Sequence, residues 1–372
     1  MKKGILFVTG GFHPELHGGS IQINHLIKSL KKNFNTFVLS SSKIYDTSLL
    51  DISNKLNIFR LKKDNNYFLR LFNILKMILF FFLIQRKISI IHFRGFTKKV
   101  ILLILLGKIF RKKIIYSPTR YLEDDIYTLK KNFFFYFFIK KIDLLLCISP
   151  IFFSGKNFFI KKVFKFQYLP NFVDLNIFKF KKKKFHKNLN ILFIGFFSKV
   201  KNPQLIYNAW KKIKNSNTNL TFIGRKSFDY YLSDSKIYDK IYNDAKKNNL
   251  LKRIKFIDQT NKVTKYYNDC DIFVLPSKTE GMPNVLLEAM ASGLVPIVLK
   301  ISNLYSDIII DKFNGFILKK NSVQELSATL DKLIVNKRKL NQISLNARKT
   351  IENKFDLSFY LPRIKNIYKK LS

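Results

Sequence analysis

Acidic residues, cysteine and glycine are all scarce in this chain of 372 residues. It carries 24 Asp and Glu against 68 Lys and Arg, for a net charge of +44. Its two cysteines, Cys147 and Cys270, each lie in or beside an apolar run, so the sequence excludes a disulfide framework and a cysteine-based metal site. Gly and Pro number 13 and 9 while 47% of the residues are hydrophobic, which indicates a folded chain rather than a disordered one.

The positive charge comes mainly from lysine, which supplies 57 of the 68 basic residues. Lys, Asn, Ile and Phe are abundant together, as codon usage in an AT-rich genome would produce, so part of the charge is attributable to compositional drift. The alternative interpretation is a surface that attracts anionic lipid or an acidic acceptor. The basic residues are spread along the chain and no nucleic-acid-binding motif is present, so we expect an anionic membrane surface and no nucleic acid as a partner.

Long uninterrupted apolar runs are also lacking. The best candidate, residues 71–84, is 14 residues long and contains Lys76, whereas a membrane span needs about 20 apolar residues. The favoured interpretation is a packed helix of an α/β domain. The alternative is a helix in the membrane interface with its basic flanks on lipid headgroups, a face that residues 133–138 could join. The first residues predict no signal peptide, because their apolar run is short before Gly10.

Two blocks of alternating strands and helices follow from the hydrophobic pattern. In the first block we expect strands at 4–9, 36–40, 57–61, 88–93, 113–117 and 140–148, with helices at 20–31, 69–86 and 98–110. In the second we expect strands at 190–195, 219–224, 254–257, 271–275, 295–299 and 315–318, with helices at 201–214, 238–249, 323–336 and one or two within 340–372. Repeated βα units predict two doubly wound parallel sheets.

The domain boundaries follow from this alternation. We expect an N-terminal domain over residues 1–173 and a basic linker over 174–189, which contains the run Lys181 to Lys184. A C-terminal domain is expected over 190–350, and a final helix within 351–372 is expected to pack back onto the N-terminal domain. At this length the chain is large enough for two separate hydrophobic cores.

The most informative stretch is residues 271–298, DIFVLPSKTEGMPNVLLEAMASGLVPIV. It predicts a buried strand, a loop, a short helix and another buried strand. Pro283 and Asn284 are helix-start residues, and Gly293 is a helix-stop residue. Glu280 then lies in the loop and Glu288 about one turn into the helix. A helix N-terminus at the end of a parallel strand favours phosphate, and carboxylates accept hydrogen bonds from sugar hydroxyls.

This stretch resembles the hallmark EGxPNxxLEAMAxGxPVV of the retaining glycosyltransferases of family 4, which have the GT-B fold. The matching residues are Glu280, Gly281, Pro283, Asn284, Leu287, Glu288, Ala289, Met290, Ala291 and Gly293, with Pro296 one position late. The resemblance implies two Rossmann-like domains that face a central cleft. It also implies that Glu280 contacts the donor sugar and acts in catalysis, and that Glu288 binds the ribose. Donor-binding roles are expected at Gly281, Met282, Pro283, Asn284 and Val285, whose backbone N–H groups, Pro283 excepted, point at what lies above the helix.

The resemblance extends to the N-terminal half. Gly18 and Gly19 resemble the family's glycine loop after the first strand, which faces the donor diphosphate. The stretch IIHFRG at 90–95 resembles the strand that carries an HxH pattern into the cleft. Here His92 holds the first position and Arg94 replaces the second histidine. The resemblance therefore implies catalytic roles for His92 and Arg94, and it leaves open which of them meets the transferred sugar.

A third match is IGFFSKVKN at 194–202, which resembles the family's diphosphate-binding loop. Gly195 and Lys201 are in place, but Phe196 stands where the family has an arginine. Lys199 or Arg225, which follows the next strand end, are the candidates to supply the missing cation. If neither does so, we expect weaker donor binding, because a charged contact to phosphate contributes on the order of a few kcal/mol.

The resemblance implies transfer of a sugar from a UDP- or GDP-sugar to a glycan or lipid-linked glycan, with retention of configuration. The expected setting is cell-surface polysaccharide or lipopolysaccharide synthesis, by a cytoplasmic protein peripheral on the inner face of a bacterial membrane. No Asp-x-Asp pattern stands at a strand end, so we expect no metal and no cofactor. Two alternatives stay open, a non-catalytic GT-B binding protein, which Phe196 and Arg94 favour, and a nucleotide-sugar epimerase.

Overall fold

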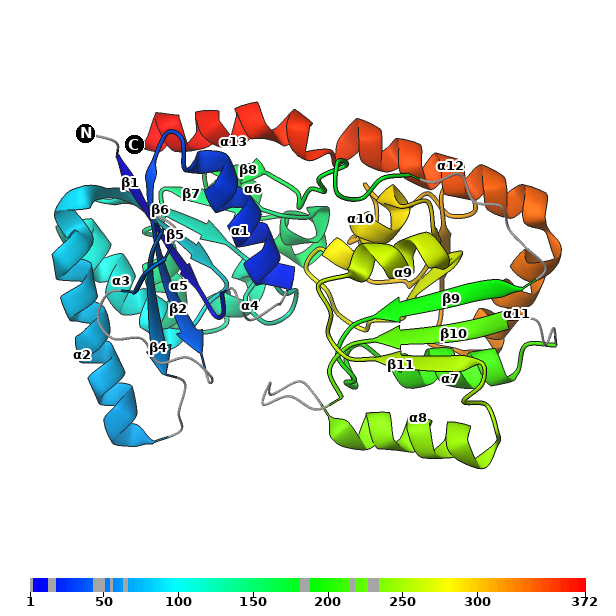
Figure 1. Cartoon of the computed structure of the whole chain (residues 1–372). Coiled ribbons are helices and arrows are strands. Elements are labelled where there is room, and N and C mark those ends of the chain that lie inside the picture. The colour runs from blue at the N-terminus through cyan, green and yellow to red at the C-terminus, as the bar shows by residue number, and fades with distance from the viewer. Residues whose placement is uncertain are drawn as a thin grey trace. The chain divides into compact units, whose positions relative to one another are not determined.

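The computed structural model describes residues 3–12, 18–42, 51–53, 56–62, 66–180, 188–214, 218–226 and 234–372, with only the backbone described at 18, 51–53, 56–57 and 98–99. The lysine run at 181–184 lies outside this part of the chain. The chain forms two compact units (Figure 1). Unit 1 comprises Met1–Asn171 together with Ser358–Ser372, and unit 2 comprises Phe172–Leu357.

The backbone passes between the units twice, at 171–172 and at 357–358. The two passages are paired by hydrogen bonds. The amide of Val173 donates to the carbonyl of Phe355, and the amide of Leu357 donates to the carbonyl of Val173, each at 2.9 Å. Unit 1 is consequently built from two separate parts of the sequence. The expected domain boundary at residue 173 lies two residues beyond the division between the units.

Unit 1 is built on one eight-stranded sheet in the order β3-β4-β2-β1-β5-β6-β7-β8. Its strands are β1 (Gly4–Thr9), β2 (Asn35–Ser42), β3 (Asp51–Ser53), β4 (Leu56–Lys62), β5 (Ile88–Arg94), β6 (Lys113–Ser117), β7 (Leu144–Cys147) and β8 (Phe166–Tyr168). All neighbours pair in parallel except β3, which is antiparallel to β4. The chain leaves β1 toward β2 on one side and returns to β5 on the other, so the direction of winding reverses between β1 and β5.

Two layers of helices cover this sheet. Its helices are α1 (Gly18–Leu30), α2 (Tyr67–Ile84), α3 (Lys98–Ile109), α4 (Ile126–Lys130), α5 (Phe133–Ile139), α6 (Ile160–Val163) and α13 (Leu357–Leu371), with 3-10 turns at Gln85–Lys87, Pro150–Phe152 and Gly155–Asn157. The crossovers through α2, α3 and α5 all run in one direction along the strand order, and right-handed crossovers place them on one face of the sheet.

The other face of this sheet carries α1 and α13. Tyr368 of α13 has ring contacts with Phe7 of β1 and His92 of β5, at centroid distances of 6.2 and 6.0 Å. On the opposite face, a Cβ atom added at Gly107 of α3 would lie 2.9 Å from Cδ1 of Ile91, the neighbour of His92 in the strand. Successive side chains of a strand point to opposite faces, so both faces of the sheet are covered by helices.

Unit 2 has a six-stranded sheet in the order β11-β10-β9-β12-β13-β14. The strands are β9 (Leu189–Ile194), β10 (Thr218–Ile223), β11 (Ile254–Ile257), β12 (Ile272–Leu275), β13 (Val295–Leu299) and β14 (Phe316–Leu318), all parallel. The helices are α7 (Pro203–Lys211), α8 (Ser235–Lys247), α9 (Val263–Asp269), α10 (Asn284–Ala291), α11 (Val323–Val335) and α12 (Lys337–Lys354). In Figure 1, α7 and α8 lie on one face of this sheet, and α9 and α10 lie on the other.

The prediction of two doubly wound α/β domains is confirmed, with local corrections. The helix expected from residue 201 begins at Pro203, because Asn202 adopts a left-handed conformation (φ 54°) and proline favours the first helical position. Lys201 therefore lies in a loop. The strand expected to enter at 140–148 is confined to Leu144–Cys147, and the short elements β3, β8, α4, α5 and α9 were not predicted.

Candidate functional site

The winding of the unit 2 sheet reverses between β9 and β12. From β9 the chain continues to β10 and β11 on one side, and then crosses to β12, β13 and β14 on the other. The loops that follow β9 and β12 therefore start at neighbouring strand ends and lead to opposite sides of the sheet. In open parallel sheets such a reversal leaves a crevice at the carboxyl ends of the strands, where ligands bind. Of the residues predicted for the site, Gly195 and Lys201 follow β9, and 280–285 follow β12.

Lys201 and Glu280 meet at this reversal. The ammonium of Lys201 donates to Oε1 of Glu280 at 2.5 Å, and their side chains are 26% and 10% exposed. The amide of Lys278 donates to the carbonyl of Val200 at 2.8 Å, so the backbones of the two loops are also joined. A lysine has three donors and a carboxylate can accept several hydrogen bonds, so the pair keeps further bonding capacity. The structure thus brings together two of the residues that the sequence singled out 79 positions apart.

Two glycines hold the ends of β9 and β10 in close contact. A Cβ atom added at Gly224 would lie 1.9 Å from the carbonyl oxygen of Gly195, which is closer than any side chain allows. The amide of Gly195 donates to the carbonyl of Ile223 at 2.9 Å. A Cβ at Gly195 would itself lie 3.7 Å from Cγ of Lys201. The absence of side chains here leaves bare backbone beside Lys201. Arg225, the other predicted cation, follows Gly224 and is half-buried.

The loop before α10 starts the helix as predicted. Pro283 is the N-cap residue, with φ −78° and ψ 111°, and the helix begins at Asn284. Met282 and Asn284 are 6% and 5% exposed. The helix ends before Gly293, whose φ of 84° is the left-handed conformation that glycine adopts readily. The first-turn amides of a helix point out of its N-terminus, so 281–285 presents backbone dipoles at the end of β12.

Glu288 lies one turn into α10 and has a tyrosine as its partner. Oη of Tyr267, on α9, donates to Oε2 of Glu288 at 2.9 Å. Burial raises the pKa of Glu288 to about 7, and the hydrogen bond from Tyr267 opposes that rise. Near neutral pH this carboxyl group is therefore present in both its protonated and its ionised form. Sequence reasoning missed Tyr267, because no local pattern indicates a partner 21 residues further along the chain.

The sequence analysis also did not identify two buried hydroxyl groups of unit 2, those of Ser277 and Tyr305. Ser277 and Tyr305 are 0% and 3% exposed, and neither hydroxyl has a hydrogen-bond partner among the described residues. Burial, with a contribution from the negative charge of Glu280, raises the pKa of Tyr305 well above its ordinary value. Tyr305 is therefore within electrostatic reach of Glu280. Buried hydroxyls without a partner are uncommon, and a ligand hydroxyl would satisfy them.

In unit 1 the corresponding reversal lies between β1 and β5. The glycine loop after β1 falls partly outside the described residues, which resume at Gly18, the first residue of α1. Among the described residues, no atom lies within 4 Å of a Cβ added at Gly19. Arg94, the last residue of β5, is 8% exposed. Burial lowers the pKa of Arg94 to about 10, which leaves the guanidinium charged at neutral pH.

His92 is 1% exposed and is engaged through both ring nitrogens. Nδ1 lies 2.6 Å from Oη of Tyr368 and Nε2 lies 2.8 Å from Oγ of Ser117. Burial, together with the positive charge of Arg94, lowers the pKa of His92 well below its ordinary value, so the imidazole is neutral. In this arrangement His92 connects β5 to α13 and to β6. The structure gives it a contact role within the core of unit 1, and its predicted catalytic role stays a prediction.

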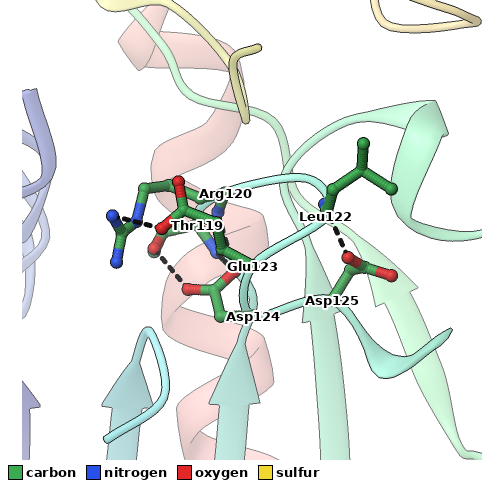
Figure 2. Close-up of polar contacts among 6 residues, drawn as sticks. All are labelled: Thr119, Arg120, Leu122, Glu123, Asp124 and Asp125. Atoms are coloured by element: carbon green, nitrogen blue, oxygen red, sulfur yellow. Dashed lines mark hydrogen bonds and ion pairs between the residues drawn. The ribbon is translucent and has the colours of Figure 1, made fainter. Parts of the chain in front are cut away.

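The acidic turn at 119–125 is shaped by its own carboxylates (Figure 2). Asp124 accepts from the amide of Thr119 at 2.9 Å, from its hydroxyl at 2.7 Å and from the amide of Arg120 at 2.7 Å. Asp125 accepts from the amide of Leu122 at 2.7 Å and caps α4. Burial raises the pKa of Asp124 to about 6, against these hydrogen bonds. Within the described ranges, no group of three or more His, Cys, Asp or Glu side chains is arranged to hold a metal ion.

Residues 175–350 match the model of the family described as "Glycosyl transferases group 1", a stretch that covers nearly all of unit 2. This region belongs to the group 1 glycosyltransferases, and the chain has the GT-B fold. This confirms the resemblance seen in residues 271–298.

Two relatives match over part of their length. An uncharacterized glycosyltransferase of Haemophilus influenzae is 31% identical over 171 residues, covering 40% of this chain and 48% of the relative. The UDP-Gal:alpha-D-GlcNAc-diphosphoundecaprenol alpha-1,3-galactosyltransferase of Escherichia coli is 32% identical over 134 residues, covering 35% and 34%. The matches thus span half or less of these relatives.

A solved structure extends the likeness to the whole fold. Anabaena HepE in complex with UDP-glucose superposes with a TM-score of 0.77, at 16% sequence identity, over 99% of each chain. At that identity the likeness shows the fold alone.

Proposed function

We propose that this protein transfers a sugar from a nucleoside diphosphate donor to an acceptor hydroxyl, with retention of the anomeric configuration. The observation that carries the proposal is the meeting of Lys201 and Glu280 at the reversal of the unit 2 sheet, beside the N-terminus of α10. A cation and backbone amides suit a diphosphate, and carboxylates suit sugar hydroxyls.

Different residues of unit 2 bind different parts of the donor. Lys201 and the backbone of 281–285 hold the diphosphate, on the bare backbone left by Gly195. Glu288 accepts a hydrogen bond from a ribose hydroxyl, and Glu280 contacts the transferred sugar. The acceptor oxygen forms a bond to the anomeric carbon while the bond from that carbon to the diphosphate breaks. The acceptor proton passes to the leaving phosphate oxygen, and Lys201 and the amides stabilise the negative charge that develops there.

We assign acceptor recognition to unit 1, with Arg94 as its cation at the end of β5. Arg94 Nε has no hydrogen-bond partner among the described residues, so it keeps bonding capacity for a ligand. His92 acts as a positioning residue, because both of its nitrogens are engaged.

We further propose a UDP-sugar as the donor and a lipid-linked glycan as the acceptor, at the cytoplasmic face of a bacterial membrane. The E. coli relative is named for UDP-Gal and for a diphosphoundecaprenol acceptor, and the HepE structure holds UDP-glucose, which supports this choice. Cell-surface polysaccharide or lipopolysaccharide synthesis is the setting that these substrates favour.

The test is a thermal-shift panel of UDP, GDP, ADP, CMP, UDP-sugars and GDP-sugars on the wild type, Lys201→Met and Lys199→Met. A ligand that binds only the folded protein raises its melting temperature. We expect a rise that is specific to uridine nucleotides. Lys201→Met should weaken binding by roughly 10- to 100-fold, because a charged contact contributes about 1.5–3 kcal/mol.

Lys199→Met tests the other lysine of the same loop, which the sequence left as a candidate cation. Lys199 is exposed whereas Lys201 is bonded to Glu280, so Lys199→Met should weaken donor binding less than Lys201→Met does. No shift with any nucleotide at millimolar concentration would contradict the proposal and favour a non-catalytic binding protein. Release of an isomerised nucleotide sugar without an acceptor would identify an epimerase instead.

A further inference from the structure

Helix α2 carries large apolar side chains on the side that faces solvent. Phe68, Phe72, Leu75, Leu79 and Phe82, which we call the α2 stripe, are between 48% and 78% exposed. Their spacing of four, three, four and three residues places them along one side of the helix. Exposed apolar residues that are contiguous in this way, unlike scattered ones, mark a surface that something else covers. The helix lies at the edge of unit 1 in Figure 1, coloured cyan.

The opposite side of α2 is packed into unit 1. Phe80 stacks on Phe59 of β4 with ring centroids 4.7 Å apart, and Nδ2 of Asn73 donates to the carbonyl of Lys62 at 2.7 Å. Among the described residues, the one helical stretch long and apolar enough to cross a membrane, by length and composition alone, is Tyr67–Lys87. Crossing would require α2 to leave the sheet and expose Phe59 and Phe80. The packing therefore favours a helix that lies along a membrane surface over one that spans it.

In the chain segment that carries α2 and α3, residues 66–118, every charged side chain other than histidine is basic. Arg70, Arg86, Lys87 and Arg111 are exposed, and Nζ of Lys76 lies 4.7 Å from the centroid of the Phe72 ring. Long basic side chains rest their stems on apolar surface and keep their charged ends in water. An apolar stripe with a cationic border is complementary to an anionic lipid surface.

The same helical layer continues this surface to α5. Phe110, just after α3, has ring contacts with both Phe81 and Phe82 of α2, at 5.6 and 5.5 Å. Helix α3 in turn packs against α5. On α5, Phe133, Phe134 and Phe137 are 84%, 56% and 49% exposed. Nζ of Lys141 lies 4.7 Å from the Phe137 ring centroid, which repeats the arrangement of Lys76 on Phe72.

We propose that the α2 stripe, extended by the exposed phenylalanines of α5, docks onto an anionic lipid bilayer with α2 parallel to the membrane plane. A second copy of this chain is a poor occupant, since it would bring together two surfaces of the same positive sign. The proposal deepens the membrane location proposed above and rests on it. The docking surface does not involve the donor residues of unit 2. Failure of membrane docking would therefore leave the proposed sugar transfer untouched, and failure of donor binding would leave the docking proposal untouched.

The test is co-sedimentation of the full-length protein with vesicles of phosphatidylcholine and phosphatidylglycerol, and with vesicles of phosphatidylcholine alone. The variant is Phe68→Glu with Phe72→Glu, near the start of α2, where acidic residues favour a helix. The matched control is Phe313→Glu with Phe359→Glu, which makes the same two changes at 52% and 63% exposed positions away from the stripe. The melting temperature without ligand serves as the folding control for all three proteins.

We expect the wild type to bind the anionic vesicles and to release as salt is raised, since salt screens surface charges. The stripe variant should bind at least about tenfold more weakly, and the control variant within about twofold of the wild type. A wild type that stays in the supernatant at low salt would overturn the proposal. Equal losses in both variants would also overturn it, because net charge alone would then explain binding. A wild-type dimer that the stripe variant dissociates would assign the stripe to a second copy.

A tryptophan placed on the stripe gives an independent readout. The chain has one tryptophan, Trp210, which is 4% exposed in unit 2. Leu75→Trp therefore adds a single exposed fluorophore to unit 1. Its emission should shift to shorter wavelength when anionic vesicles are added, because the ring enters the headgroup region. An unchanged spectrum with vesicle-bound protein would place the contact elsewhere and overturn the assignment to α2.

Discussion

Unit 1 and unit 2 are both built on mainly parallel sheets covered by helices, but the two units differ in the polarity of their outer helices. In unit 1, His92 and Asp124 are bonded inside, while the outer side of α2 is apolar. In unit 2, α8 buries only Ile241 and Ala245 and carries charges of both signs, while Lys201 and Glu280 lie at the strand ends. A polar group bonded in the interior supports the fold, whereas one at a strand-end crevice keeps bonding capacity for a ligand. The position of a charged residue, more than its type, decides its role.

The largest expected effect concerns the backbone contact at the unit 2 site. Gly224→Ala would place a Cβ 1.9 Å from the carbonyl oxygen of Gly195, and backbone cannot yield as a side chain does. We expect the variant to lose about 3 kcal/mol of the free energy of unfolding of unit 2. Trp210, buried in α7 of that unit, reports its unfolding by fluorescence in urea.

Gly10→Ala is the matched change in unit 1. A Cβ at Gly10 meets no atom of the described residues within 4 Å, so the free energy of unfolding should change by less than about 0.5 kcal/mol. Similar losses in the two variants would show that the close approach at Gly224 does not set the difference between the units.

The next largest effect concerns two tyrosine hydroxyls. That of Tyr368 is hydrogen-bonded to His92, and that of Tyr305 has no partner among the described residues. Tyr368→Phe removes the partner of His92 Nδ1 and leaves a buried ring nitrogen unpaired, at a cost of about 1–3 kcal/mol. The loss should be confined to unit 1, where amide hydrogen exchange of β5 and α13 measures it. Donor binding in unit 2 should not change.

Tyr305→Phe is the counterpart in unit 2. No hydrogen bond to the Tyr305 hydroxyl exists among the described residues, so its removal should leave the melting temperature of the free protein nearly unchanged. If the hydroxyl serves the donor sugar, affinity for the UDP-sugar should fall while affinity for UDP stays the same. A large loss of stability would instead show that Tyr305 has a structural role.

The smallest expected effect is the pH dependence of donor binding. The pKa of Glu288 is about 7, so its carboxyl is mostly protonated at pH 6 and mostly ionised at pH 8. Because the ionised form is the better acceptor for a ribose hydroxyl, donor affinity should rise by less than about tenfold between these values. The ligand should be a UDP-sugar, since the terminal phosphate of UDP titrates near pH 6 itself.

Glu288→Gln is the control for this profile. Glutamine retains an acceptor oxygen but does not titrate, so the variant should bind with little dependence on pH. A step that persists in the variant would have to come from another group. The effect on stability has the opposite sign. Because the folded protein holds the Glu288 proton more tightly than the unfolded chain, this group favours folding progressively as pH falls from about 7 toward its ordinary range.

Local sequence rules account for much of the fold and for the helix that carries part of the site. The start of α10 at Asn284 and its end before Gly293 follow from helix-capping preferences, and β12 and β13 follow from apolar runs of strand length. Family resemblance brought Lys201 and Glu280 together because each stands in a recognisable motif. The shift of α7 to Pro203 was accessible from proline preferences alone, and it shows how one residue moves Lys201 from helix to loop.

Contacts over long sequence separations were not predictable in this way. Tyr368 lies 276 residues from His92, and nothing near either residue indicates the other. Helix α5 was missed because its run of phenylalanines has no polar side, so its pattern does not distinguish a helix from a strand. For the same reason the sequence did not decide whether α2 is a packed helix of the domain or a helix in the membrane interface. The packing of Phe80 on Phe59 and the hydrogen bond of Asn73 to Lys62 distinguish the buried side of α2 from its exposed side.

Because the backbone passes between the units twice, the two units are completed in a fixed order during synthesis. Unit 1 needs residues 358–372, which leave the ribosome after all of unit 2. At about 5–20 residues per second, the intervening 186 residues (172–357) take on the order of ten to forty seconds to make. Until then His92 has no Tyr368, and one face of the first sheet lacks its last helix. The unit that begins the chain is therefore the second to be completed.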